Sequence, residues 1–114
     1  MQDTLCSVCH GYTHGNQTIL PDDAEVEALA DFFTVLGSPT RLKILLALDN
    51  GELCAGHLAQ AVGMAPSAVS NQLKALKAAR LISVRREGKM LFYSLADCHP
   101  RAIVRLAMSH VNET

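Results

Sequence analysis

Histidine and carboxylate side chains stand at both ends of the last predicted helix. His99 and His110 are eleven residues apart, and Glu113 follows three residues later. At about 100° per residue these side chains share one helix face, and Ile103 and Leu106 lie between them on that face. Imidazole and carboxylate groups are ligands for Zn²⁺. The pattern therefore indicates an apolar seam with metal ligands at its ends.

A single helix cannot bring both histidines to one ion. With a rise of about 1.5 Å per residue, His99 and His110 lie about 16 Å apart, whereas a metal–nitrogen bond is about 2 Å long. An antiparallel copy of the helix would solve this for both ends. Asp97 supplies a fourth ligand, because the residue before Pro100 avoids helical geometry and an extended segment there points Asp97 and His99 the same way. We expect a homodimer holding Zn²⁺, or Co²⁺ in its place, with Asp97 and His99 from one chain and His110 and Glu113 from the other.

Sulfur ligands gather near the start of the chain, in the sequence LCSVCHGYTHG. Its Cys-x-x-Cys spacing lets two thiolates bind one tetrahedral ion, and so short a segment has no core of its own to fold around. Farther along, Cys54 and His57 lie one helical turn apart and share a face of a predicted helix. A self-contained site near the start of the chain would use Cys6, Cys9, His10 and His14.

The composition is that of one globular intracellular domain. Of the 114 residues 49% are hydrophobic and only 4% aromatic, with no Trp, so the core must be aliphatic. No apolar run approaches the roughly 20 residues that span a bilayer, and the first residues lack the layout of a signal peptide. We expect a cytoplasmic protein with no membrane partner, whose four cysteines are ligands or free thiols. Cys98, expected to point away from Asp97 and His99, is the thiol outside the two sets of ligands.

The elements that must position these residues are four helices, a hairpin and a fifth helix. Residues 1–21 show no apolar periodicity and are expected to form a flexible, metal-binding arm, followed by one domain over 22–114. Apolar spacing and cap residues predict helices over 22–36, 39–50, 53–61 and 65–79. Two runs rich in Ile, Val, Phe and Tyr flank Glu87-Gly88-Lys89 and predict a β-hairpin. Pro100 is expected to open the last helix.

Basic residues are concentrated around the fourth helix and the hairpin. Six of them stand against a single acid between residues 70 and 90, although the whole chain has a net charge of −1. Two short helices joined by AVGMAPS and followed by a basic hairpin are typical of a winged helix-turn-helix. A solvated polar face is the alternative for the helix alone, and the turn and the basic hairpin together favour DNA. The predicted DNA-binding residues are Ser67, Ser70, Asn71, Gln72, Lys74, Arg85, Arg86 and Lys89.

The segments LGSPTRLKILLAL and ELCAGHLAQAVGMAPSAVSNQLKALKAARLISVRREGKMLFYSL, together with the closing helix, resemble the ArsR/SmtB family of metal-sensing repressors. The resemblance covers nearly everything from about Glu25 onward. It implies a homodimeric winged helix-turn-helix protein, mainly α with a β-hairpin in the order ααααββα. Such a dimer binds operator double-stranded DNA when metal-free and releases it when metal binds. The layout D-x-H, ten further residues and H-x-x-E is similar to the family's zinc site at all four positions, whereas Pro100 is a departure.

The resemblance also implies a thiolate site that joins the N-terminal arm to the third helix, often across the dimer. By position, Cys54 and His57 match the helix pair. His57 stands where the family has an acid, and the Cys-x-Cys of its thiolate-rich members is missing. Cysteine ligands suit several soft ions, so Zn²⁺, Cd²⁺, Pb²⁺ and Co²⁺ are all candidates. The arm ligands implied are Cys6 with Cys9 or His10, and His14 is a further candidate.

Three other functions compete with metal-dependent repression. A zinc hydrolase needs an open coordination position and a nearby base. Both sites here are expected to be fully ligated by protein, and no G-x-S-x-G motif occurs, so we expect no enzyme. A thiol-redox-responsive repressor would use Cys6, Cys9 and Cys54. A purely structural zinc in either site is the third alternative.

Overall fold

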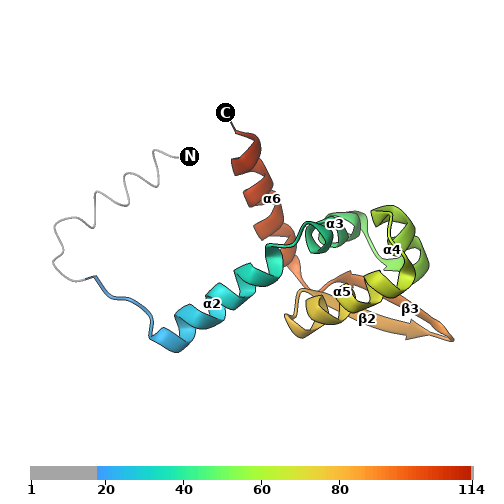
Figure 1. Ribbon diagram of the computed structural model, residues 1–114, viewed down its shortest axis with the longest axis horizontal. Helices are drawn as coiled ribbons and strands as arrows, with labels where there is room; N and C mark the ends of the chain where they lie inside the picture. Colours follow the sequence, from blue (N-terminus) through green and yellow to red (C-terminus); the bar gives the residue numbers. More distant parts are fainter. Residues whose placement is uncertain (1–17, 114) are drawn as a thin grey trace.

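The computed structural model describes residues 18–113, and the predicted order of helices and hairpin is confirmed (Figure 1). The helix-turn-helix consists of α4 and α5, and β2 with β3 forms the wing. In chain order the elements are α2 (Asp23–Leu36), α3 (Pro39–Ala47), the 3₁₀ turn η1 (Leu48–Asn50), β1 (Leu53–Cys54), α4 (Ala55–Val62), α5 (Pro66–Ala78), β2 (Ile82–Glu87), β3 (Met90–Leu95) and α6 (Cys98–Asn112).

Local sequence sets the ends of the helices. Asp22 caps α2, because its carboxylate accepts a hydrogen bond from the Glu25 N–H at 2.9 Å. Ser38 caps α3 in the same way, accepting from the Arg41 N–H at 3.3 Å. Gly63 ends α4 in the left-handed conformation, with φ 71°, which glycine adopts without a steric penalty. The tight turn between α4 and α5 follows directly from this glycine.

One aliphatic core holds the winged helix-turn-helix together. Val69, Leu73 and Leu76 form the inward stripe of α5 and are buried. They pack with buried residues from the neighbouring elements: Leu36, Ile44, Leu45, Leu48, Leu58, Ala59, Leu81, Ile82 and Val104. The opposite face of α5, which carries Ser67, Ser70, Asn71 and Lys74, is exposed.

The sheet has three antiparallel strands in the order β1-β3-β2. The prediction that the third helix starts at Leu53 is wrong, because Leu53 pairs with Tyr93 and Cys54 pairs with Phe92. The outer edge of β3 offers unpaired backbone groups, and this pairing satisfies some of them. Gly88, at the turn of the hairpin, has φ 63°, the positive value expected there.

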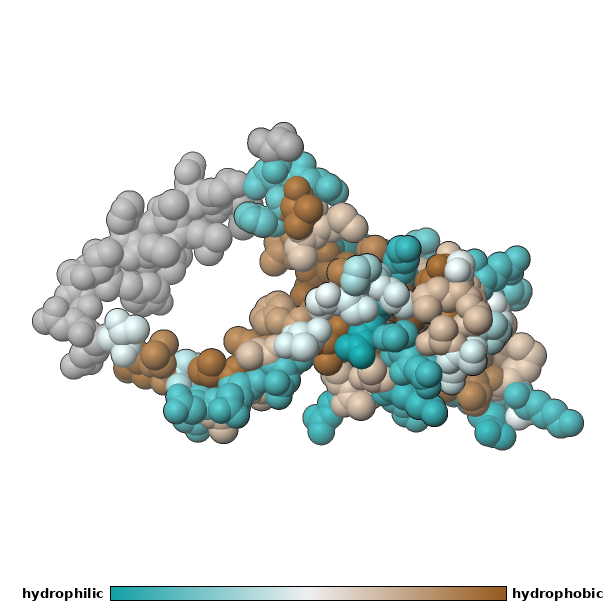
Figure 2. All heavy atoms as spheres, in the orientation of Figure 1, coloured by the Kyte–Doolittle hydropathy of each residue, from teal (hydrophilic) through white to brown (hydrophobic). Residues whose placement is uncertain are grey.

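Two helices, α2 and α6, project from this body (Figure 1). The radius of gyration is 17.7 Å, whereas a compact chain of this length has about 13 Å. Large apolar side chains remain exposed on both: Leu29 and Phe33 on α2, and Leu106 and Val111 on α6. Figure 2 shows apolar atoms along both helices. Among the described helices, none combines the length and the apolar character needed to span a bilayer.

Candidate metal centres and nucleic-acid interface

Asp97 and His99 lie at the beginning of α6, but not in the backbone conformation that the sequence predicts. Helix α6 begins at Cys98, so the prediction of an extended segment through His99 and of a helix opened by Pro100 is wrong. Asp97 alone is extended, and its carboxylate caps the helix by accepting from the His99 N–H at 2.8 Å. Pro100 is tolerated because the first turn of a helix has no internal partner for its N–H groups.

The capped conformation brings the two side chains together. The distance from His99 Nδ1 to Asp97 Oδ1 is 3.4 Å. Two ligands at about 2.0 to 2.1 Å from a tetrahedral ion are themselves about 3.4 Å apart. Both side chains are open to solvent, with 79% of His99 and 54% of Asp97 exposed. The pair therefore has the separation and the access that half of a zinc site requires.

His110 lies at the opposite end of α6, and Glu113 follows the last residue of the helix. His110 is exposed, three helical turns from His99 along the axis. Within residues 18–113, no three His, Cys, Asp or Glu side chains of one chain come close enough to hold a metal ion together. A four-ligand site built from these residues consequently needs a second chain.

An apolar groove runs beside the face of α6 that carries the histidines. It has a volume of about 410 Å³ and lies between α2, α3 and α6. Leu106, on α6, is 73% exposed. The groove is lined by residues that include Phe33, Leu42, Leu46, Ile103, Met108 and Val111. This surface suits a helix–helix contact with a second copy of the chain.

Cys54 and His57 form a second pair with the spacing of ligands. Cys54 precedes the first residue of α4 and is buried, and His57 is exposed on the first turn of the helix. The distance from Cys54 Sγ to His57 Nδ1 is 3.4 Å. A thiolate and an imidazole on one tetrahedral zinc ion are about 3.5 Å apart. The remaining predicted ligands of this site lie outside the described residues: Cys6, Cys9, His10 and His14.

The outward face of α5 carries most of the predicted base-reading side chains. Gln72 differs from the others, because it is half-buried and its Oε1 accepts a hydrogen bond from Arg41 Nε at 2.9 Å. The amide of Gln72 is therefore held by α3 rather than extended toward a groove. The exposed members of the set are Ser67, Ser70, Asn71 and Lys74.

Arg85 is held against the protein at the base of the wing. Its guanidinium donates to both carboxylate oxygens of Glu52, at 2.7 and 2.8 Å, and to Glu87 at 3.3 Å. It also lies over the ring of Phe92, 4.6 Å from the centroid. The hydrogen bond from Arg85 lowers the pKa of Glu52, and the bond to Glu52 raises the pKa of Arg85. An arginine bound in this way is less available to a DNA phosphate.

Arg86 and Lys89 differ from Arg85 in their surroundings. Both are exposed on the wing, as Arg85 is, but within residues 18–113 neither of them forms an ion pair. Arg86 lies next to Arg85 on β2, so its side chain points to the other face of the sheet. Arg85 and Glu87 are two residues apart on one strand, so their side chains lie on the same face of the sheet. This spacing indicates from the sequence alone that Glu87 can bind Arg85. Glu52 gives no such signal, because it comes from a distant part of the chain.

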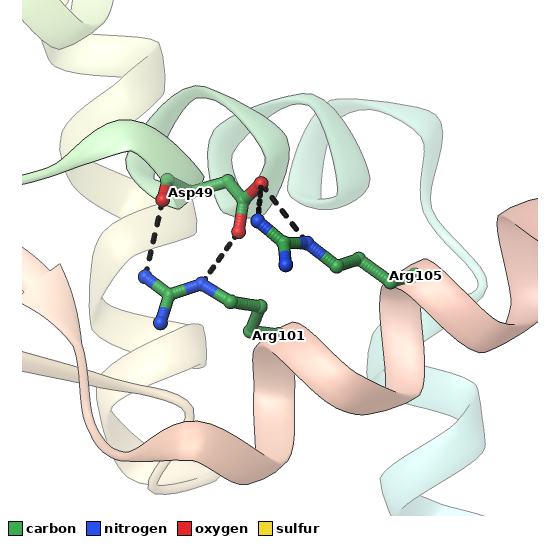
Figure 3. Close-up of polar contacts among 3 residues, drawn as sticks. All are labelled: Asp49, Arg101 and Arg105. Carbon is green, nitrogen blue, oxygen red and sulfur yellow. Dashed lines mark hydrogen bonds and ion pairs between the residues drawn. The ribbon is translucent and has the colours of Figure 1, made fainter.

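Three residues that tie α6 to the body were not predicted from the sequence. Arg101 and Arg105, on α6, both bind the carboxylate of Asp49 in η1 (Figure 3). The two arginines are four residues apart on the helix, a spacing that places them on one face. Their partner lies about fifty residues earlier, and nothing in the local sequence indicates the contact.

Comparison with known proteins gives the same architecture. Residues 38–84 match the family described as "Bacterial regulatory protein, arsR family". The chain is 40% identical over 90 residues to a "Transcriptional repressor SmtB homolog" of Synechocystis sp., covering 79% of this chain and 68% of that protein. It is 38% identical over 102 residues to the "HTH-type transcriptional regulator NmtR" of Mycobacterium tuberculosis, covering 89% and 85%.

A solved structure agrees with these matches. The homodimeric winged helix-turn-helix DNA-binding domain of a possible ArsR-family regulator from Mycobacterium bovis, determined by NMR in solution, superposes with a TM-score of 0.75. The two sequences are 29% identical, and the superposition covers 85% of this chain and 92% of that one.

Proposed function

The chain belongs to the ArsR/SmtB family of bacterial transcriptional regulators, and from this premise we propose that it is a repressor that responds to Zn²⁺ or a similar divalent ion. The metal-free homodimer binds operator DNA and releases it when metal binds. The observation that carries the proposal is the pair formed by Asp97 and His99 at 3.4 Å, at one end of the α6 face that His110 occupies at the other. The protein acts as a cytoplasmic regulator and not as an enzyme.

The proposed site is shared between two chains. In an antiparallel pair of α6 helices, Asp97 and His99 of each chain meet His110 and Glu113 of its partner. Two equivalent sites then lie at the two ends of the interface, and Leu106 lies between them. The apolar groove beside α6 supports this arrangement, because a second copy would bury surface that one chain leaves exposed.

The donor set favours zinc among divalent ions. Two imidazole nitrogens and two carboxylate oxygens suit tetrahedral Zn²⁺, with Co²⁺ as a substitute. The pair formed by Cys54 and His57 supplies sulfur and nitrogen to the second proposed site, whose remaining ligands come from the arm over 1–21. Thiolate ligands there extend the range of candidate ions to Cd²⁺ and Pb²⁺.

In the proposed complex with DNA, the exposed polar residues contact either base edges or phosphates. One α5 helix from each subunit enters a major groove, where Ser67, Ser70 and Asn71 reach base edges and Lys74 reaches a phosphate. Arg86 and Lys89 contact the adjacent backbone from the wing. Dimer geometry sets the distance between the two α5 helices, so operator affinity depends on how the subunits are joined.

The response to metal follows from the position of the ligands. A bound ion would supply a bridge between the two chains at each end of the α6 interface. If His99 of one chain and His110 of the other bound the same ion, they would hold the α6 pair at one crossing angle. The subunits then lose the arrangement that fits two successive grooves. Because the coupling is reciprocal, operator DNA weakens metal binding by the same factor, typically about 5- to 150-fold.

The test is a titration of operator binding with each metal. The probe is a duplex selected from a random-sequence library with the metal-free protein, and the readout is fluorescence anisotropy. We expect Zn²⁺ to weaken binding of the wild type and to leave His110→Ala bound. Zinc binding with unchanged operator affinity would contradict the proposal.

A parallel arm of the experiment separates the metal response from a thiol-redox response. Cys54→Ser is titrated with the same duplex, and each protein is also treated with a mild oxidant. Metal sensing predicts that His99→Ala and His110→Ala lose the response. A redox repressor predicts that both of these variants respond normally to oxidant while Cys54→Ser does not.

A further inference from the structure

A single carboxylate joins α6 to the winged body. Arg101 Nε donates to Asp49 Oδ1 at 2.6 Å, and Arg101 Nη2 donates to the Asp49 carbonyl oxygen at 3.1 Å. Arg105 donates to the other carboxylate oxygen through Nη2 at 2.9 Å and Nε at 3.3 Å. Figure 3 shows the two guanidinium groups reaching Asp49 from successive turns of α6. Asp49 therefore accepts the hydrogen bonds of all four donors.

The arginines lie on the opposite side of α6 from the proposed metal ligands. At about 100° per residue, Arg101 and Arg105 are about 200° and 240° around the helix from His99. His110 returns to within about 20° of His99 by the same count. Asp49 therefore binds α6 on the side of the helix that faces away from the proposed metal ligands.

The rest of the contact between α6 and the body is apolar. Pro100 and Val104 are the buried residues of α6, and Ile103 packs beside them. Apolar contact is non-directional, whereas a guanidinium–carboxylate fork fixes both distance and orientation. Among the described residues, the side-chain hydrogen bonds and ion pairs that join α6 to another element all end on Asp49. Among the described contacts between α6 and the body, the cluster is therefore the directional one.

On the body side, Asp49 is connected to α5 through η1 and α3. It sits in η1 directly after Leu48, which is buried in the core, and α3 continues into η1. Helix α3 packs against both α4 and α5. Asp49 also precedes Cys54 by only five residues, through Gly51 and the short strand β1. A displacement of Asp49 would reach α5 and the proposed thiolate site by short connections.

We propose that Asp49 is a positioning residue for the metal response. Through Arg101 and Arg105 it fixes the angle between α6 and the winged body, so that a reorientation of the α6 pair moves the two α5 helices. The inference rests on the proposed function, because the movement it transmits begins at the α6 metal site. Substitution of Asp49 leaves the proposed metal ligands and the DNA-binding residues in place. It removes the coupling between metal binding and operator binding.

The experiment compares Asp49→Asn with a matched control, Asp31→Asn. Asp31 is an exposed acid on α2, so both variants remove one negative charge and keep the shape of the side chain. Operator dissociation constants are measured with and without Zn²⁺, and zinc affinity is measured without DNA by chelator competition. For Asp49→Asn we expect metal-free operator affinity and zinc affinity within about twofold of wild type. The ratio of the operator dissociation constant with Zn²⁺ to that without Zn²⁺ is typically about 5 to 150 for such couplings. For Asp49→Asn this ratio should fall to within about threefold of unity.

Two further variants test whether the cluster acts as a unit. The double variant Arg101→Gln/Arg105→Gln should reproduce the loss, and adding Asp49→Asn to it should change the ratio no further. Asp49→Glu keeps the charge and should restore most of the coupling. A ratio for Asp49→Asn within twofold of wild type, or an equal loss in Asp31→Asn, would overturn the proposal.

A readout without metal or DNA separates this inference from the proposed function. Hydrogen exchange of residues 98–105 is followed by mass spectrometry in the metal-free protein. Asp49→Asn should exchange faster there by at least about fivefold, with α5 unchanged. Unchanged exchange overturns the positioning role whether or not wild type responds to zinc. If wild type shows no zinc response but the exchange result holds, the proposed function fails and the mechanical link remains.

Discussion

Leu106 offers a quantitative test of the proposed dimer interface. The residue is 73% exposed in one chain, at the middle of the seam between the two histidines. Full burial of a leucine side chain contributes about 2 kcal/mol relative to full exposure. Burial of the exposed part therefore contributes about 1.5 kcal/mol per subunit and, because a two-fold axis repeats the contact, about 3 kcal/mol per dimer. Leu106→Ala keeps the Cβ and loses about two thirds of this, or about 2 kcal/mol.

The assay is sedimentation equilibrium over a wide range of protein concentration. A loss of about 2 kcal/mol corresponds to a dimer dissociation constant about 30-fold weaker than wild type. Met90→Ala is the control, because Met90 is also large, apolar and exposed but lies on the wing. We expect it to leave dimerisation unchanged. A dissociation constant for Leu106→Ala within threefold of wild type, or an equal effect of Met90→Ala, would refute the burial argument.

Three further predictions follow from the ion pairs and the thiolate pair. The hydrogen bonds from Arg105 and Arg101 lower the pKa of Asp49 from 3.8, so its contribution to stability is present above about pH 3.8 and lost as the pH falls through the lowered value. In urea denaturation, the free energy of unfolding should be higher for wild type than for Asp49→Asn at pH 7, and this difference should be smaller at pH 3. A difference of the same size at both pH values would contradict this linkage. Arg86→Gln should reduce the slope of the logarithm of the operator-binding constant against the logarithm of salt concentration by about one unit for each phosphate that the side chain no longer neutralises. Arg85→Gln should reduce this slope less, because the Arg85 side chain already binds Glu52. The reverse order of the two slopes would place Arg85 on the DNA. Cys54→Ser should lower the zinc content of the saturated protein by about two ions per dimer while the α6 sites still fill, and an unchanged metal content would exclude Cys54 as a ligand.

Most of the fold could be predicted because its signals are local. Ser38 and Gly63 mark a helix start and a helix end through hydrogen bonding and backbone geometry that involve only a few neighbours. The inward stripe of α5 follows from helical periodicity alone. The strand at Leu53 and Cys54 could not be predicted in this way, because two residues are too short for a period and their pairing partner is forty residues away.

Asp97 and His99 lie close together, as the sequence predicts, but for a different reason. The sequence predicts that Asp97 and His99 lie together because an extended segment precedes Pro100. In the structure they lie together because Asp97 caps the helix that already contains His99. A proline in the first turn is compatible with both conformations, so the sequence pattern did not distinguish them.

The contacts that could not be predicted are those between distant segments. Gln72 and Arg85 have the residue types of a DNA-binding surface, but Arg41 and Glu52 hold them against the protein. Asp49 has no distinguishing local pattern, yet it accepts hydrogen bonds from both Arg101 and Arg105 of α6. Partners of this kind depend on how the chain packs and leave no periodic trace in the sequence.

The central claim, that each α6 site takes ligands from two chains, can be tested by mixing two inactive variants. In a heterodimer of His99→Ala and His110→Ala subunits, one site lacks both histidines and the other has both. At a free zinc concentration at which neither homodimer binds metal, we expect about one zinc ion per heterodimer and a partial return of zinc-dependent operator release. A site formed within a single chain would give no recovery of either, and that result would exclude a site shared between two chains.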